Sequence, residues 1–379
     1  MPPLNAFAKA GVALASILAL STGNTEQQLG ASADLSTAPR VTIDRPKPTF
    51  MLMERDKRVH GLKPFQDLVD KAPPGSILKP PPGTYAGPVT IDKPLTIDGG
   101  GKVTIDAGDK GTVMVLNASN VVIRGLRLTG SGDSHDTDDS CLDVRGHHNL
   151  IEDNVVDNCL FGIDLKQVND STVRGNRIKS KDFELGVRGD GLRLWYSNNN
   201  VVEKNEIIDS RDMVAWYSHR NIFRDNLGRR SRYSIHFMFA NDNIVERNQF
   251  YDNAVGIYFM YTEGGAARHN VISHATGATG MGIGFKEASG TLIENNEIIY
   301  CGIGIGSDLS PFQPDSTIEI KGNRFAYNGI GILFNSETGG NNVRDNVFEG
   351  NLTQVTYGGR GDNSNSAKNF WEGNYWDDY

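Results

Sequence analysis

The stretch between Asp190 and Glu287 repeats one short segment five times: GLRLWYS (191–197), MVAWYS (213–218), IHFMFA (235–240), GIYFMYT (256–262) and GIGFKE (282–287). Each segment alternates in character, which is typical of a β-strand because successive side chains point to opposite faces. The segments recur about once every 22 residues. Each repeat therefore contributes one strand, and the copies are expected to stack.

A second repeated element is a short apolar run that closes on an asparagine. A period of 21 or 22 residues, the shortest spacings seen, is typical of one turn of a parallel β-helix. Asparagine suits the corner because it tolerates a left-handed backbone, and stacked asparagines can bond one another. We predict an all-β chain of ten or more coils, with loops near residues 179–188, 276–280, 308–315 and 358–367 where the repeat is longer. The closing residues are Asn154, Asn176, Asn205, Asn226, Asn248, Asn270, Asn296, Asn323, Asn346 and Asn374.

The N-terminal region differs from the repeats. Lys9 precedes an apolar run over residues 10–20, which is too short to span a bilayer and suits a signal peptide. We assign residues 1–33 to a signal peptide and its cleavage region, 34–60 to a proline-broken linker, and 61–379 to the β-helix. Residues 64–72 have helical spacing, and we expect this short helix to cap the open end of the stack.

Composition excludes several classes of protein. The net charge is −8 and no polybasic patch occurs, so nucleic acid is not an expected partner. A leucine-rich horseshoe would need a helix in each repeat, and none is indicated. Three cysteines do not make a disulfide framework, so we expect buried thiols, although Cys141 and Cys159 lie about one repeat apart and could meet.

Superposing the segments produces columns of side chains. Two columns are apolar and suit the interior: Leu192, Met213, Ile235, Ile257 and Ile283, and then Leu194, Ala215, Phe237, Phe259 and Phe285. Two others face outward: Arg193, Val214, His236, Tyr258 and Gly284, and then Trp195, Trp216, Met238, Met260 and Lys286. The outward face is too apolar for plain surface, and we look for function there.

Three of these residues form a candidate metal site. His236 and Met238 lie about 7 Å apart on one face of a strand, and Met260 lies about 4.8 Å from Met238 on the next. Imidazole and thioether ligands together select Cu(I), so we expect transient Cu(I) binding and no tightly bound cofactor. The alternative is that this face is packing beneath a loop. Flanking positions are Arg193, Trp195, Met213, Trp216, Tyr258, Met281 and Lys286.

Two charged clusters have plainer interpretations. The acidic segment 133–139 could hold Ca²⁺ or act in acid–base chemistry, but its spacing matches no known calcium loop, and we expect a solvated loop. The basic segment 229–232 could hold an acidic sugar, and pairing with acidic neighbours is the expected alternative.

Longer strings carry a family resemblance. GDGLRLWYS (189–197), DSRDMVAWYS (209–218), RYSIHFM (232–238), GMGIGFKE (280–287) and GNYWDDY (373–379) resemble the NosD family over residues 60–379. The resemblance implies a right-handed parallel β-helix in the periplasm. It implies a non-enzymatic maturation factor for the CuZ-type copper-sulfide centre of nitrous oxide reductase. Implied partners are an ABC-type ATPase and its membrane permease, a copper-chaperone lipoprotein and the apo reductase.

Two other functions remain open. A carbohydrate-active β-helix enzyme, either a uronan epimerase or a polysaccharide lyase, would share the fold, and fold does not determine function. Such epimerases usually carry Asp-Pro-His-Asp, and this chain contains no Asp-Pro pair. A passive scaffold, whose outward face only docks other proteins, is the third possibility.

Overall fold

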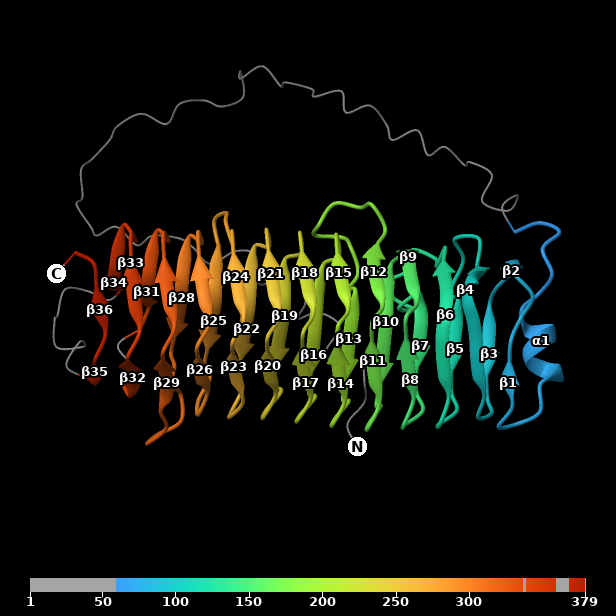
Figure 1. Cartoon of the computed structure of the whole chain (residues 1–379), viewed down its shortest axis with the longest axis horizontal. Helices are drawn as coiled ribbons and strands as arrows, with labels where there is room; N and C mark the ends of the chain where they lie inside the picture. Colours follow the sequence, from blue (N-terminus) through green and yellow to red (C-terminus); the bar gives the residue numbers. More distant parts are fainter. Residues whose placement is uncertain (1–58, 337–338, 359–367, 379) are drawn as a thin grey trace, which may run out of the picture. The chain divides into compact units, whose positions relative to one another are not determined.

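The computed structural model describes residues 59–336, 339–358 and 368–378. These residues form successive coils of a parallel β-helix (Figure 1). Most coils add one strand to a 12-stranded sheet and two strands to a 24-stranded sheet, whereas β4 and β6 are single long strands in their coils. The prediction of ten or more parallel coils is confirmed, and extra residues leave the coil at 181–191, 274–280 and 309–317, as expected from the longer repeats. All but the first residue of the loop predicted at 358–367 lies outside the described residues.

The strand bounds follow the repeat closely. The 12-stranded sheet contains β3 (Val89–Ile91), β5 (Met114–Leu116), β7 (Ser140–Val144), β10 (Phe161–Lys166), β13 (Leu192–Trp195), β16 (Asp212–Trp216), β19 (Tyr233–Met238), β22 (Val255–Met260), β25 (Met281–Lys286), β28 (Ile303–Asp308), β31 (Ile330–Phe334) and β34 (Thr353–Tyr357). The 24-stranded sheet contains β1 (Ile77–Leu78), β2 (Gly83–Ala86), β4 (Thr96–Asp106), β6 (Val122–Thr129), β8 (Leu150–Glu152), β9 (Val155–Cys159), β11 (Thr172–Arg174), β12 (Arg177–Ser180), β14 (Val201–Glu203), β15 (Glu206–Ile208), β17 (Ile222–Arg224), β18 (Leu227–Arg229), β20 (Ile244–Glu246), β21 (Gln249–Tyr251), β23 (Ala266–Arg268), β24 (Val271–Ser273), β26 (Leu292–Glu294), β27 (Glu297–Ile299), β29 (Ile318–Lys321), β30 (Arg324–Ala326), β32 (Asn341–Arg344), β33 (Val347–Glu349), β35 (Phe370–Glu372) and β36 (Tyr375–Trp376).

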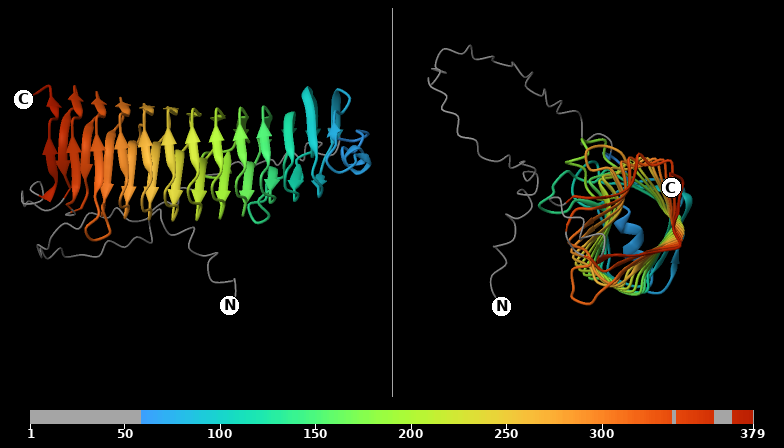
Figure 2. Two further views of the ribbon diagram at one scale, coloured as in Figure 1. Left: turned by 60° about the horizontal axis from the view of Figure 1, so that its bottom comes forward. Right: turned by 90° about the vertical axis from the view of Figure 1, so that its left-hand side faces the viewer.

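Helix α1 (Gln66–Lys71) covers the first coil, as predicted. It appears within the outline of the coils when they are viewed end-on (Figure 2). Phe65 and Val69 are buried in the core. The Gln66 side-chain amide donates to the carbonyl of Thr90 at 3.1 Å and accepts from its N–H at 2.7 Å. The helix thus occupies backbone groups of β3 that a preceding strand would otherwise bond.

The interior contains the two predicted apolar columns together with inward side chains of the 24-stranded sheet. Phe237, Phe259 and Phe285 stack with ring centroids 5.2 and 5.5 Å apart. Met213 is 1% exposed and belongs to this core. Its place as a flanking residue of the outward face is therefore wrong, because its side chain lies on the inner side of β16.

The asparagine column forms a continuous ladder between coils. The backbone N–H and the side-chain Nδ2 of Asn205 both donate to Asn226 Oδ1, at 3.0 and 3.1 Å. Asn226 repeats this pattern toward Asn248 at 2.9 and 3.0 Å and also donates to the carbonyl of Val202. Because these residues are buried, the ladder satisfies polar groups that have no access to water.

One outer column of the 24-stranded sheet alternates in charge from coil to coil. Arg174 pairs with Glu152 at 2.6 Å, and Arg268 pairs with Glu246 at 2.9 Å. Each exposed pair contributes little stability. A change in the pairing of coils would place like charges together, so the column favours one order of stacking. From β4 to β29 the column reads Asp98, Arg124, Glu152, Arg174, Glu203, Arg224, Glu246, Arg268, Glu294 and Lys321, and the alternation ends where Arg344 of β32 follows Lys321.

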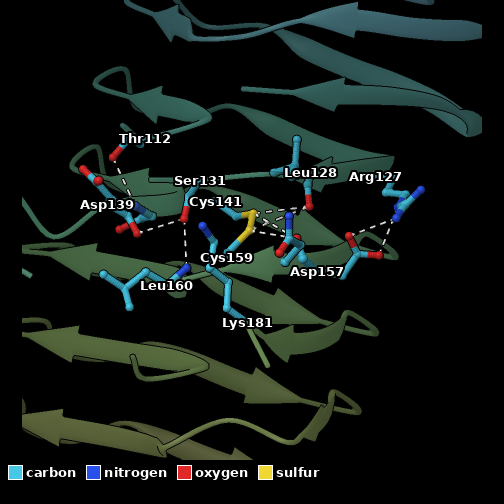
Figure 3. Close-up of a disulfide and its surroundings, with 12 residues drawn as sticks. Thr112, Arg127, Leu128, Ser131, Asp139, Cys141, Asp157, Cys159, Leu160 and Lys181 are labelled. Atoms are coloured by element: carbon cyan, nitrogen blue, oxygen red, sulfur yellow. Dashed lines mark hydrogen bonds and ion pairs between the residues drawn. A yellow bond between two sulfur atoms is a disulfide. The ribbon is translucent and has the colours of Figure 1, made fainter. Parts of the chain in front are cut away.

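The cysteines depart from the expectation of three buried thiols. Cys141 and Cys159 form a disulfide in the interior (Figure 3). Cys301 is a buried free thiol. Beside the disulfide, Ser131 Oγ accepts from the N–H of Leu160 at 2.8 Å. The spacing of about one repeat allowed this pair to meet, and the structure shows that it does.

The predicted signal peptide and nearly all of the predicted linker lie in residues 1–58, outside the described residues. Within the described ranges, no helix has the length and apolar character needed to cross a membrane.

The asparagine ladder predicts a large effect of a single buried amide. Asn226→Ala should destabilise the fold by about 2–4 kcal/mol because several hydrogen bonds are lost within the interior. Asn117→Ala, at an exposed position without a left-handed backbone, provides the matched control. Chemical unfolding of both variants should separate them clearly, and equal unfolding midpoints would contradict the role given to the ladder.

The disulfide assignment predicts a simple thiol count. Denatured but unreduced protein should titrate one thiol, Cys301, and reduced protein should titrate all three cysteines. Ellman titration of protein purified from an oxidising compartment makes the comparison. Three reactive thiols before reduction would remove the disulfide from the native structure.

Candidate functional site

The outward side chains of β10, β13, β16, β19, β22 and β25 form a surface that we call the outer wall. Parallel pairing places corresponding residues of successive strands directly over one another. One column reads Asp164, Arg193, Val214, His236, Tyr258 and Gly284. The column beside it reads Lys166, Trp195, Trp216, Met238, Met260 and Lys286. The columns derived from the sequence are therefore confirmed as neighbours.

Met238 and Met260 are in register on adjacent strands. Both are partly exposed, and Trp216 precedes them in the same column. Trp216 Nε1 is buried without a hydrogen-bond partner in the protein. The two thioether side chains thus lie on the outer wall, on neighbouring strands about 4.8 Å apart. The Trp216 indole lies next to them in the same column.

His236 belongs to the outer wall but is covered by its neighbours. Its ring lies 4.8 Å from that of Tyr233 and 5.8 Å from that of Tyr258, and the residue is 6% exposed. Neither ring nitrogen has a hydrogen-bond partner in the protein. Burial, assisted by the nearby Arg232 guanidinium, lowers the pKa of His236 to about 4. The imidazole is therefore neutral near pH 7, with lone-pair capacity that no protein group uses.

Two glycines make room for larger neighbours on the outer wall. A Cβ added at Gly284 would lie 2.4 Å from ring atoms of Tyr258, and one added at Gly306 would lie 2.6 Å from Met281 Sδ. The Tyr258 ring and the Met281 sulfur occupy these spaces. Met281 follows the column of Tyr233 rather than that of Met260, so it lies at the far edge of the wall.

The other flanking cations are neutralised. Lys286 lies 3.4 Å from a carboxylate oxygen of Asp308. Arg193 donates from Nε to Asp164 at 2.9 Å and is 8% exposed. Its carboxylate neighbours raise the pKa of the Arg193 guanidinium despite its burial. Neither residue is free to bind an anion without breaking an existing pair. In the basic segment, Arg230 and Arg232 likewise pair with carboxylates, as expected.

The acidic segment is largely exposed, as expected, but its last two residues, Asp138 and Asp139, are held against the protein. Asp138 lies 2.9 Å from Arg193 and 3.3 Å from Lys166, and Asp139 is only 7% exposed. The segment folds over the start of the outer wall because buried cations there require carboxylate partners. A cavity of about 400 Å³ is lined by Asp138, Lys166, Arg193, Trp195 and Trp216, the last of which is in register with Met238.

Sequence reasoning missed a series of charged side chains near His236. Arg211 joins Asp190 at 3.0 Å and lies 3.9 Å from Asp212, which in turn pairs with Arg232. Asp190 is 1% exposed, and burial raises the pKa of its carboxyl. The only signal in the sequence was the repetition of Asp and Arg immediately before successive strands.

These features define the class of the protein: a right-handed parallel β-helix with two neighbouring side-chain columns on one wall. Residues 179–379 match the family described as "Periplasmic copper-binding protein (NosD)", which is more than half of the chain, and the chain belongs to the NosD family. The family resemblance is therefore confirmed. All three candidate ligands, His236, Met238 and Met260, lie within the matched residues.

Other comparisons define the fold more than the chemistry. A Pseudomonas aeruginosa protein named "Probable ABC transporter binding protein NosD" is 26% identical over 133 residues, and the match spans 34% of this chain and about a third (31%) of that protein. The A-module of the Azotobacter vinelandii mannuronan C-5 epimerase AlgE6 has a TM-score of 0.63 at 15% identity, covering 82% of this chain and 92% of the module. A mannuronic-acid-specific family 6 lyase from human gut microbiota has a TM-score of 0.54 at 14% identity, covering 79% and 82%.

The buried neutral imidazole predicts a pH dependence of stability. Unfolded His236 gains a proton near pH 6.5, whereas the folded residue gains one only near pH 4. The unfolded state therefore binds more protons between these values, and His236 should reduce stability by up to about 3 kcal/mol as the pH falls from 6.5 to 4.

His236→Phe removes this titration while keeping a flat ring. The stability difference between pH 7 and pH 4.5, measured by urea unfolding, should be smaller in the variant than in the wild type. The imidazole resonances of His236 should also remain those of the neutral form at pH 5.5. A shift toward the charged form at that pH would contradict the buried, unpartnered environment.

Proposed function

We propose that this chain is a non-enzymatic periplasmic factor that handles copper for the assembly of a copper enzyme. The observation that carries the proposal is the register of Met238 and Met260 beside His236, a neutral imidazole whose two nitrogens have no protein partner. Membership of a family described as periplasmic and copper-binding supports the same assignment.

The donor set suits Cu(I) as cargo. Thioether sulfur and neutral imidazole are soft to intermediate ligands, and they discriminate against hard cations, which require oxygen ligands. His236 does not need to lose a proton before binding, because its pKa already lies near 4. The Trp216 indole, in the same column as the thioethers, would shield the bound cation through its π-face.

The finer assignment concerns the destination of the copper. We infer that the recipient is apo nitrous oxide reductase, whose CuZ-type copper-sulfide centre requires assembly in the periplasm. An ABC-type ATPase with its permease would supply the energy, and a copper-chaperone lipoprotein would act as donor. The P. aeruginosa relative's name as an ABC transporter binding protein supports a transporter partner.

A carbohydrate-active enzyme is the second candidate function. The observation in its favour is the cavity of about 400 Å³ lined by Trp195 and Trp216, because aromatic surfaces suit sugar rings. Incubation with alginate and polymannuronate, followed by NMR of the uronate composition, should show no epimerised or cleaved product. Turnover that is lost in His236→Phe would replace the copper proposal with this one.

The copper proposal predicts a specific dependence on sulfur. Met238→Leu/Met260→Leu keeps the side-chain volume and removes both thioethers, so Cu(I) affinity should fall by at least about 100-fold. Anaerobic competition with a colorimetric Cu(I) chelator measures this affinity. Met281→Leu is the matched control and should bind Cu(I) as the wild type does.

Equal Cu(I) affinity in the wild type and the double variant would exclude the thioether pair. Co-purification with the permease or reductase distinguishes a passive scaffold from a copper carrier. If the double variant still associates with these partners and still matures the reductase, the outer wall serves docking alone.

A further inference from the structure

A pocket of about 360 Å³ lies around the corner from the two thioethers. It is lined by the rings of Phe239, Tyr261 and Phe312 and by the carboxylates of Glu263 and Glu287. Phe239 and Tyr261 immediately follow Met238 and Met260 in the chain, while Phe312 comes from the loop after β28. The pocket therefore begins at the edge of the proposed copper site.

An aromatic ladder leads along the corner into this pocket. Tyr196, Tyr217, Phe239 and Tyr261 stack with ring centroids 4.8, 5.2 and 4.8 Å apart. All four have left-handed backbones, with φ between 50° and 55°. Other coils place residues such as Gln167 and Glu287 at this corner. Among the described coils, this corner thus carries aromatic rings on the four coils that also carry the Trp and Met column, with Tyr196 and Phe239 exposed and Tyr217 and Tyr261 partly exposed.

The pocket has unsatisfied acceptor capacity. Neither Glu263 nor Glu287 forms an ion pair within the described residues, although most carboxylates on neighbouring coils do. Thr262 also lines the pocket, is 3% exposed, and its hydroxyl has no hydrogen-bond partner. By contrast, Ser289 Oγ accepts from the N–H groups of Phe312 and Gln313. The Thr262 hydroxyl is itself buried, so the acceptors open to a ligand are the carboxylates of Glu263 and Glu287.

We propose that this pocket receives a basic side chain, an arginine or a lysine, from a protein that docks beside the thioether pair. Two unpaired carboxylates provide charge complementarity for a guanidinium or ammonium group. Three aromatic rings accommodate its apolar stem and attract the cation. A side chain anchored here brings the surface of its own protein over Met238 and Met260.

The commitment to a protein partner rests on the proposed copper function, because cargo transfer requires a donor or recipient to reach the thioethers. The open corner with its exposed aromatic ladder offers a continuous contact surface toward the outer wall. Aromatic residues dominate the energetics of such interfaces, and charges at their edges select the partner.

The test uses a labelled Gly-Arg-Gly tripeptide, acetylated and amidated, and its citrulline counterpart, with binding to the full chain followed by fluorescence anisotropy. The arginine peptide should bind at least about tenfold more tightly than the citrulline peptide, because only the former is charged. Glu263→Gln/Glu287→Gln should abolish this difference. Glu184→Gln/Glu372→Gln removes two other exposed carboxylates and should leave it unchanged.

Equal binding of the two peptides would overturn the proposal. Tighter binding of free arginine amide than of the tripeptide would show a small-molecule site and would also overturn it. Failure of the copper proposal is distinguished separately: Met238→Leu/Met260→Leu should bind the arginine peptide as the wild type does, whereas Glu263→Gln/Glu287→Gln should retain Cu(I) affinity.

Discussion

The vertical register of the coils is the constraint on which the rest of this structure depends. Buried asparagines bond from coil to coil through both backbone and side chain, as between Asn205 and Asn226. The alternating column of acidic and basic residues disfavours stacking in any other order. Because register is held in this way, residues about 22 positions apart become neighbours 4.8 Å apart on one wall.

The same constraint explains how a chemically unusual site can persist. A buried histidine without a hydrogen bond destabilises a fold, and His236 is held there by flanking rings and by the strand that carries it. The thioethers are likewise preplaced by β19 and β22 rather than by a mobile loop. A rigid surface of this kind suits a carrier, because little conformational entropy is lost when the cargo binds.

Much of the architecture could be predicted from the sequence, since a β-helix reduces the three-dimensional problem to a repeat. The inward phenylalanine column and the pairing of Met238 with Met260 follow from alignment of the segments alone. Met213 was assigned to both faces, and only its packing showed that it belongs to the core. The alternating charges were also present in the aligned repeats. They become visible when the sign of the charge at one position is compared from repeat to repeat.

What could not be predicted depends on segments that leave the repeat. Asp138 reaches Arg193 because the acidic segment folds back over the wall, and the period of the repeat contains no information about that path. The contribution of Phe312 to the acidic pocket arises in the same way, because Phe312 lies in the loop after β28. Burial of His236 by Tyr258 also requires that residue 284 be glycine, because a side chain there would occupy the space of the Tyr258 ring. The pattern of apolar and polar residues does not reveal such a requirement for space.

X-ray absorption at the copper edge tests the central claim most directly, because it reports the atoms bound to the metal. For the Cu(I)-loaded wild-type chain, we expect both sulfur and nitrogen scatterers in the first coordination shell. In Met238→Leu/Met260→Leu, the sulfur contribution should be lost. A first shell of nitrogen and oxygen only, or a sulfur contribution that persists in the double variant, would contradict a copper site built from stacked coils.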